Sequence, residues 1–338
     1  MLYRPNTLWT WIFFVSTFIE AVVLITLEVV IYTSLQNSVT PIASTVTAYR
    51  SIPSFFALVT LGLVYQLLLV YDTLAHQNTI QVIGLGIYSG ALSVYNGIQY
   101  NQLRDIVEIL TANSVVPQNT WPLLRGMIVS IIVITASFTF WIQYSAWKLY
   151  EEFAWVTLRK VEADLQMRRR YLCFQLLLSV LKFDGFFFLG FLLQLAIIPY
   201  NKSGPTFVAI VTLIPLSCCL LFITAWVVRH EYRVGTIVIS LDQVFHLALI
   251  GFFIYMFTAF YLPRTYVEYL SAQRTLSFFG IITIVLALGT VTMICVCFRN
   301  FGQGLRPYVS GGAKARLLGE TFEMQLREGY LRVPHEAT

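Results

Sequence analysis

The chain has 338 residues, of which 57% are hydrophobic and only 12% are charged, with a formal net charge of +5. So few charged residues cannot cover a water-soluble domain of this size, which excludes a soluble globular protein. The mean hydropathy of +0.72 instead indicates a protein embedded in a membrane.

Eight apolar segments follow one another along the chain, and each is long enough to cross a bilayer as a helix. A helix rises about 1.5 Å per residue, so about 20 apolar residues cross a hydrocarbon core of about 30 Å. The segments are residues 9–34, 53–75, 79–98, 123–148, 173–198, 205–229, 238–262 and 276–298. The third is the least apolar, because serine, asparagine, glutamine and glycine residues dilute it. The sequence therefore predicts an all-α fold, a polytopic membrane helix bundle of about eight transmembrane helices in residues 1–298, followed by a cytosolic tail, 299–338.

The positions of lysine and arginine decide between eight spans and seven. Basic residues stay preferentially on the cytosolic side of short loops. Eight spans with a cytosolic N-terminus put most of them in the cytosol, including the Arg168-Arg169-Arg170 run and those of the tail. With seven spans, that run and the tail would lie on opposite sides of the membrane. We therefore expect eight spans and both chain termini in the cytosol.

The loop around residues 149–172 predicts a helix that continues between two spans. Asp164 and Arg168 stand one helical turn apart, which suits an ion pair on a helix surface. The run Arg168, Arg169 and Arg170 either contacts anionic lipid headgroups or serves only to anchor the topology. The expected partner is thus the lipid bilayer, and the sequence predicts no binding to nucleic acid.

The end of the last span and the tail hold candidate sites for modification and sorting. Cys295 and Cys297 lie next to the membrane, where they suit palmitoylation or simple helix packing. The sequon that begins at Asn201 lies in a short outer loop, where we expect it to stay without a glycan. Apolar residues every four positions in the tail predict either a short helix that docks on the membrane or on a cytosolic sorting partner, or a disordered segment; they are Leu318, Phe322, Leu326 and Tyr330.

Several motifs of the chain resemble a fungal family of uncharacterised Golgi-apparatus membrane proteins. The central ones are Tyr150-Glu151-Glu152-Phe153-Ala154-Trp155, Glu162-Ala163-Asp164, and Leu181-Lys182-Phe183-Asp184 with Phe186-Phe187-Phe188 and Gln194. Similar segments are Trp9-Thr10-Trp11, Glu20 and Tyr71-Asp72-Thr73-Leu74-Ala75-His76-Gln77-Asn78. The resemblance implies a multi-pass protein of a fungal Golgi membrane, and it implies no mechanism.

Four charged residues lie within the predicted spans and form a candidate intramembrane polar site: Glu20, Glu28, Lys182 and Asp184. A charge at the bilayer centre costs about 2.5–3.5 kcal/mol on insertion scales, so it normally faces the bundle interior and a partner. Glu20 and Lys182 lie at similar depth, so a pair between them is geometrically allowed. Lys182 and Asp184 must address different neighbours, because two residues along a helix point to opposite faces. The four serve either structural contacts or a transport or ligand site.

Two Asp–His pairs with a spacing of four residues lie near the predicted cytosolic face. They are Asp72 with His76 and Asp242 with His246. If the two spans meet, two histidines and two carboxylates suit a zinc or proton site. The alternative is that all four are helix-end residues solvated by headgroups and water. No cofactor is expected.

Three functional classes remain open. A non-enzymatic Golgi membrane protein with a structural, cargo-organising or lipid-organising role fits the resemblance and the lack of catalytic motifs. A small-solute or proton-coupled transporter fits the buried charges, although no internal repeat is visible. A seven-helix receptor fits a loop-poor bundle but not an even number of spans. An enzyme is the class with least support.

Overall fold

The computed structural model describes residues 7–40, 47–160, 165–197, 205–230, 235–260 and 272–299. All regular secondary structure in these ranges is helical, which confirms the predicted all-α fold. The described ranges contain eight long helices, of 25 to 41 residues, and one short 3-10 helix. They are α1 (Leu8–Ser38), η2 (Thr47–Ser51), α2 (Ile52–His76), α3 (Thr79–Ala112), α4 (Thr120–Lys160), α5 (Leu165–Ile197), α6 (Pro205–His230), α7 (Gly235–Phe260) and α9 (Gln273–Arg299).

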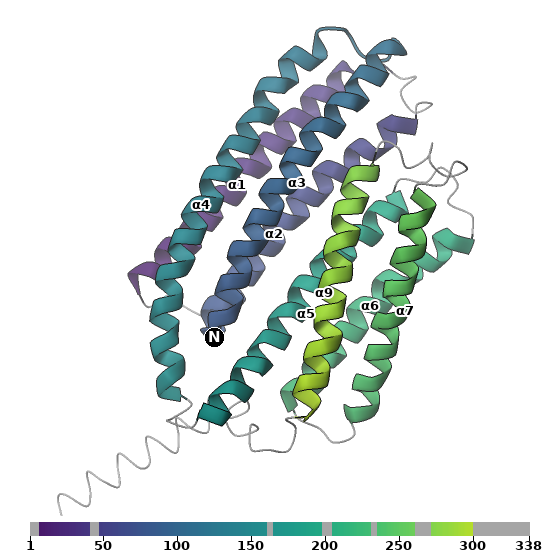
Figure 1. Cartoon of the computed structure of the whole chain (residues 1–338). Coiled ribbons are helices and arrows are strands. Elements are labelled where there is room, and N and C mark those ends of the chain that lie inside the picture. Colours follow the sequence, from purple (N-terminus) through teal and green to yellow (C-terminus); the bar gives the residue numbers. More distant parts are fainter. Residues whose placement is uncertain are drawn as a thin grey trace, which may run out of the picture.

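Two groups of helices lie side by side, α1 to α4 in one and α5, α6, α7 and α9 in the other (Figure 1). In the first group α4 packs against both α1 and α3, and α2 packs against the same two helices. In the second group α5 packs against α6 and α9, and α7 packs against the same two. Helix α3 also contacts α5 and α9, so it joins the two groups.

Six helical segments of the described ranges are long and apolar enough to cross a membrane by length and composition. They are Leu8–Ser38, Ala48–His76, Thr120–Trp155, Arg168–Ile197, Phe207–Val228 and Gln273–Cys297, with Val244–Met256 of α7 as a shorter apolar stretch. Large apolar side chains on these helices point away from the bundle: Phe140 is 78% exposed and Phe222 is 74% exposed. Such surfaces suit a lipid environment and not water.

Helix α3 has low hydropathy because its polar residues face the interior of the bundle. Gln81, Asn96 and Gln99 on this helix are all buried. Asn96 donates a hydrogen bond from Nδ2 to Thr135 Oγ1 on α4 at 2.9 Å. The face of α3 that contacts other helices is shielded from lipid, so this face tolerates polar side chains that a lipid-facing surface does not.

The two ends of the predicted helical loop 149–172 are confirmed as helix, in α4 and α5, while residues 161–164 lie outside the described ranges. The structure also extends α3 well beyond the predicted end at residue 98, to Ala112. That extension is amphipathic, with Leu103, Ile106 and Leu110 buried, so a hydropathy average does not detect it.

Glycines let α3 and α5 approach each other closely. A Cβ atom added at Gly84 would lie 2.3 Å from the Phe183 ring of α5. A Cβ atom at Gly90 would meet no atom within 4 Å. The close approach is therefore at Gly84, where Phe183 continues into a cluster of rings on α3, α5 and α9 that also contains Tyr88 and Phe187.

Candidate functional site

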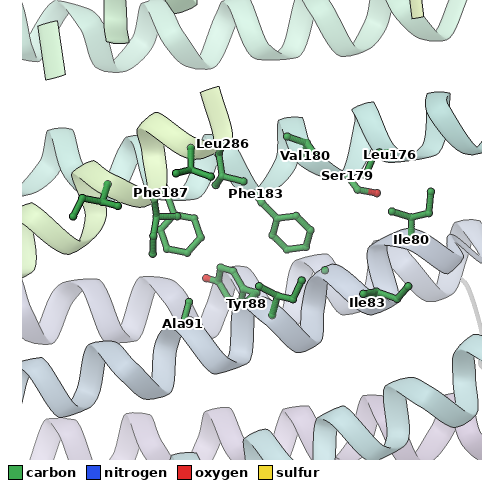
Figure 2. Close-up of a pocket in the computed structure, with 15 residues that line it drawn as sticks. Ile80, Ile83, Tyr88, Ala91, Leu176, Ser179, Val180, Phe183, Phe187 and Leu286 are labelled. Carbon is green, nitrogen blue, oxygen red and sulfur yellow. The ribbon is translucent and has the colours of Figure 1, made fainter. Parts of the chain in front are cut away.

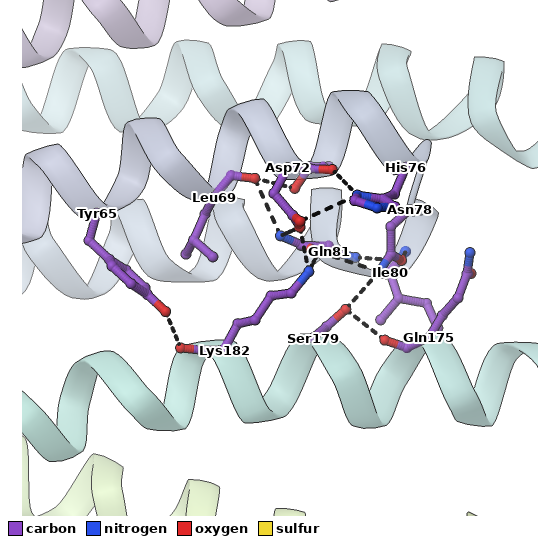
Figure 3. A network of polar contacts seen from close by, with 11 residues as sticks. Tyr65, Leu69, Asp72, His76, Asn78, Ile80, Gln81, Gln175, Ser179 and Lys182 are labelled. Carbon is purple, nitrogen blue, oxygen red and sulfur yellow. Dashed lines mark hydrogen bonds and ion pairs between the residues drawn. The ribbon is translucent and has the colours of Figure 1, made fainter. Parts of the chain in front are cut away.

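A polar network joins the α2–α3 turn to the middle of α5 (Figure 3). The Lys182 ammonium on α5 donates to the Asp72 carboxylate on α2, and it donates to Gln81 Oε1 on α3 at 3.0 Å. The Gln81 amide donates to Asp72 Oδ2 at 2.9 Å. The side chains of Lys182 and Asp72 are 31% and 30% exposed, so neither charge is sealed in the core. The network neutralises the lysine and holds three helices together.

The turn between α2 and α3 gives this network its shape. Gln77 has φ of 51°, a left-handed conformation that ends α2. Asn78 then caps α3, because its Oδ1 accepts hydrogen bonds from the backbone amides of Ile80 at 3.1 Å and Gln81 at 3.2 Å. The Asn78 amide donates to Ser179 Oγ on α5 at 3.1 Å. One asparagine thus starts α3 and ties it to α5.

His76 lies at the end of α2, beside the network. Its Nδ1 is 3.3 Å from Asp72 Oδ1, which confirms that this predicted pair forms across one helical turn. The Tyr65 hydroxyl, on the other side, donates to the backbone oxygen of Lys182 at 2.7 Å. Helix α2 therefore contacts α5 through two polar groups, the Tyr65 hydroxyl and the Asp72 carboxylate, while His76 supports Asp72.

The Glu20–Lys182 pair that their similar depth allows does not form in the structure. Glu20 is buried on α1 and accepts a hydrogen bond from Gln66 Nε2 on α2 at 3.1 Å, whereas Lys182 binds Asp72. Position along a helix predicts depth in the membrane but not which helix lies next to it. The acidic partner of Lys182 is Asp72, which the sequence places near the cytosolic face.

Asp184 faces a different neighbour from Lys182, as predicted. Its Oδ2 lies 3.3 Å from His246 Nε2 on α7 and accepts a hydrogen bond from Thr290 Oγ1 on α9 at 3.2 Å. Asp184 and His246 are 2% and 3% exposed. Together with Ser217 of α6, they line a cavity of about 10 Å³. This volume is close to the smallest space that holds one water molecule. Four helices thus meet at one buried polar point.

Among the four predicted intramembrane charges, Glu28 has the fewest hydrogen bonds with neighbouring side chains in the described residues. Its side chain is buried on α1, and neither carboxylate oxygen has a hydrogen-bond partner among the described residues. The Gln99 side chain of α3 approaches the carboxylate without completing a hydrogen bond. The burial of the Glu28 carboxylate is therefore not compensated by a hydrogen bond among the described residues.

The predicted cluster of two Asp–His pairs does not assemble in the described part of the chain. His246 turns to Asp184 in the second group of helices, while His76 stays with Asp72 at the end of α2. The side chain of Asp242 lies outside the part that the structure describes. Among the described residues, no group of three or more histidines, cysteines or acidic residues is placed to hold a metal ion.

The remaining predicted sites are separated by burial. Cys295 is exposed near the end of α9, whereas Cys297 is buried and its thiol lies 3.6 Å from the backbone oxygen of Cys173. Arg169 is exposed near the start of α5. Asn201 and the tail from residue 300 onward lie outside the described ranges.

An apolar groove between α3, α5 and α9 is the feature that the sequence did not predict (Figure 2). Its volume is about 440 Å³, within the range of small-ligand sites. The residues that line it are Ile80, Ile83, Gly84, Ile87, Tyr88, Ala91, Leu176, Ser179, Val180, Phe183, Phe187, Ile281, Ile282, Val285 and Leu286. Each helix presents only an ordinary apolar face, so the hydropathy pattern holds no sign of a groove.

Comparison with known proteins gives one informative relative. A UPF0658 Golgi apparatus membrane protein of Schizosaccharomyces pombe is 23% identical to the chain over 279 residues, which are 76% of this chain and 78% of the relative. The match confirms the predicted family resemblance. No family model matches the chain, and no solved structure matches it.

Two of the segments that resemble this fungal family meet in the structure. Asp72, His76 and Asn78 come from the segment at the end of α2, and Lys182 comes from the segment in α5, 110 residues from Asp72. The Lys182–Asp72 contact joins them, and the Asn78–Ser179 contact lies beside it. The polar network is therefore where two segments that are distant in the sequence come together.

Proposed function

We propose that the chain is a non-enzymatic, multi-pass protein of the Golgi membrane that organises lipid or cargo. The observation that carries this proposal is the Lys182 network. In it, the ammonium of Lys182 on α5 contacts Asp72 on α2 and Gln81 on α3 and so holds the three helices together. A lysine whose charge is balanced by Asp72 and which donates a hydrogen bond to Gln81 has a structural role. The name of the fungal relative supports the location.

The arrangement of the other charges supports the same role. Glu20 is bound by Gln66, and Asp184 is bound by His246 and Thr290. The Glu20–Gln66 and Asp184–Thr290 contacts link helices that pack directly against each other, and the Asp184–His246 contact reaches across the second group from α5 to α7. Charged residues within a membrane that are matched in this way stabilise packing, because the alternative is an unsatisfied group in hydrocarbon.

Location and orientation are tested first. A fluorescent fusion of the full chain in a fungal cell should label Golgi compartments, and reporter tags before Met1 and after Thr338 should both face the cytosol. A tag inserted near Asn113, in the α3–α4 connection, should face the lumen. Labelling of the plasma membrane or the vacuole, or termini on opposite sides, would contradict this part of the proposal.

The role is tested by removing the chain from a fungal cell and measuring Golgi membranes. We expect a changed lipid composition or a changed retention of Golgi cargo, restored by the wild-type chain. The Lys182→Met variant should restore less than wild type at equal expression, because its network is broken. Normal lipid composition and normal cargo in the deletion strain would refute an organising role.

A proton-coupled transporter is the second candidate, and the Asp184–His246 contact is what favours it. A carboxylate and an imidazole buried together in a membrane bundle are a common arrangement for moving protons. Purified protein in liposomes that contain a pH-sensitive dye tests this directly. A proton flux that the Asp184→Asn variant abolishes would establish transport and displace the organising role.

A further inference from the structure

We propose that the groove between α3, α5 and α9 is a binding site for the acyl chain of a membrane phospholipid. This inference deepens the proposed lipid-organising role and rests on it for its biological meaning. It concerns the groove lined by Ile80 to Ala91 of α3, the facing surface of α5, and residues 281–286 of α9 (Figure 2).

The lining chemistry selects an apolar occupant. The accessible surface of the groove is apolar, because the hydroxyls of its two polar lining residues, Ser179 and Tyr88, donate to backbone oxygens of the protein. Such a surface favours an apolar occupant over water or a polar solute. The residues at its edge are exposed: Ile87 by 68%, Val285 by 62% and Ile281 by 53%. Apolar residues exposed on a membrane helix face lipid, so the groove opens sideways into the bilayer.

The length of the groove matches one leaflet. Along α3 it extends from Ile80 to Ala91, which is about 16 Å at about 1.5 Å per residue. Half of a hydrocarbon core of about 30 Å is nearly the same length. One end lies next to the α2–α3 turn and the other lies near the middle of the helices. An acyl chain that runs parallel to α3 fits this space.

A polar end next to the groove suits the head of such a lipid. Ser179 lines the groove and also accepts a hydrogen bond from Asn78 in the polar network. The Ser179 hydroxyl donates to the Gln175 backbone oxygen, and Lys182, three residues further along α5, is bound by Asp72 and Gln81 outside the lining of the groove. A glycerophospholipid that has its chain in the groove therefore places its polar head at the end where the polar network of the protein lies.

The position between the two groups of helices distinguishes the groove from the general lipid surface. Tyr88 and Phe187 form its inner wall, and their rings are 5.9 Å apart in an edge-on contact. Tyr88 is fixed by a hydrogen bond from its hydroxyl to the Gly62 backbone oxygen at 2.9 Å. A rigid aromatic wall gives a bound chain persistent van der Waals contact, which is the main source of affinity between apolar groups inside a membrane.

The test uses the full chain in nanodiscs made with a phosphatidylcholine that carries a photoreactive diazirine in the middle of one acyl chain. After irradiation, labelled peptides are mapped by mass spectrometry. We expect labels to concentrate on α3, α5 and α9 at the groove. The variant Ala91→Trp fills the inner end and should reduce groove labelling about tenfold. Val133→Trp, on the lipid-exposed face of α4, is the matched control and should leave it unchanged.

A second variant, Ile87→Trp, keeps the test decisive if Ala91→Trp fails to fold. Ile87 is at the open edge of the groove, where a larger side chain has room, and its replacement should also lower labelling. Equal labelling of α4 and the groove, or no effect of either tryptophan, would overturn the site. Such failures leave the Golgi location and the cargo measurements untouched, so they are distinguishable from failure of the proposed function.

Discussion

Replacing Lys182 by methionine removes the centre of the polar network and keeps most of the apolar stem. The substitution takes away the donors to Asp72 and to Gln81 Oε1. Asp72 keeps the Gln81 amide and His76. We therefore expect α5 to lose much of its attachment to the α2–α3 turn, while the helices themselves still form.

The size of the effect follows from the exposure of the pair. Fully exposed ion pairs contribute about 0–1 kcal/mol, whereas breaking a fully buried pair costs about 3–5 kcal/mol. Lys182 and Asp72 are 31% and 30% exposed, so they lie between these limits. We expect Lys182→Met to lower the free energy of unfolding by about 1–3 kcal/mol, the range for hydrogen bonds to charged groups after partial screening.

The assay is unfolding of the purified chain in mixed micelles titrated with a denaturing detergent. A double-mutant cycle of Lys182→Met with Asp72→Asn separates the pair from other effects, and we expect a coupling energy of about 1–2 kcal/mol. The matched control is the exposed pair of Arg104 and Glu108, whose atoms lie 2.8 Å apart and whose side chains are 54% and 57% exposed. Arg104→Met should leave the free energy of unfolding unchanged, because water and salt screen an exposed pair.

Additive losses in the cycle would refute this account of the network. A coupling below about 0.5 kcal/mol is the value for independent sites, and it would show that Lys182 and Asp72 do not stabilise the fold together. An equal loss for Arg104→Met would likewise show that the measurement reports charge in general and not this contact.

Three further predictions use closely matched substitutions. Gly84→Ala should lower stability by about 1–3 kcal/mol because its Cβ atom would overlap a packed ring, whereas Gly90→Ala on the same helix should raise stability by up to about 1 kcal/mol; similar melting temperatures of the two variants would contradict the packing described. Glu28→Met should stabilise the chain by about 1–3 kcal/mol in the same detergent titration, because both carboxylate oxygens lack partners among the described residues, and a loss would show that the carboxylate makes a necessary bond. If α9 is palmitoylated near its end, Cys295→Ser should lower the label in an acyl-exchange assay and Cys297→Ser should not, because of these two cysteines Cys295 is exposed and Cys297 is buried. The reverse result would contradict the described orientation of the end of α9.

The sequence by itself determined the helices and their approximate positions. Crossing a membrane requires a continuous apolar helix, and that requirement is local, so it is visible in a window of about 20 residues. The weak third segment, residues 79–98, is helical and lies within α3, and the hydropathy pattern did not predict the extension to Ala112 because that part is amphipathic and not uniformly apolar. The motifs Tyr71–Asn78 and Leu181–Asp184 also gave the family resemblance before the comparison confirmed it.

The tertiary structure alone decided which charged groups meet. Similar depth allows Lys182 to pair with Glu20, yet Lys182 binds Asp72, and Asp184 contacts His246 on α7. Depth follows from counting residues along one helix, but the choice of partner depends on which helices are neighbours and on how each is rotated.

The groove was equally invisible in the sequence. In water, the apolar face of a helix points to the core, so the pattern reveals orientation. In a membrane the lipid is as apolar as the protein interior, and an isoleucine at position 87 is equally suited to a neighbouring helix, to lipid or to the edge of a groove. The same physics that makes membrane spans easy to recognise therefore removes the information about how they pack.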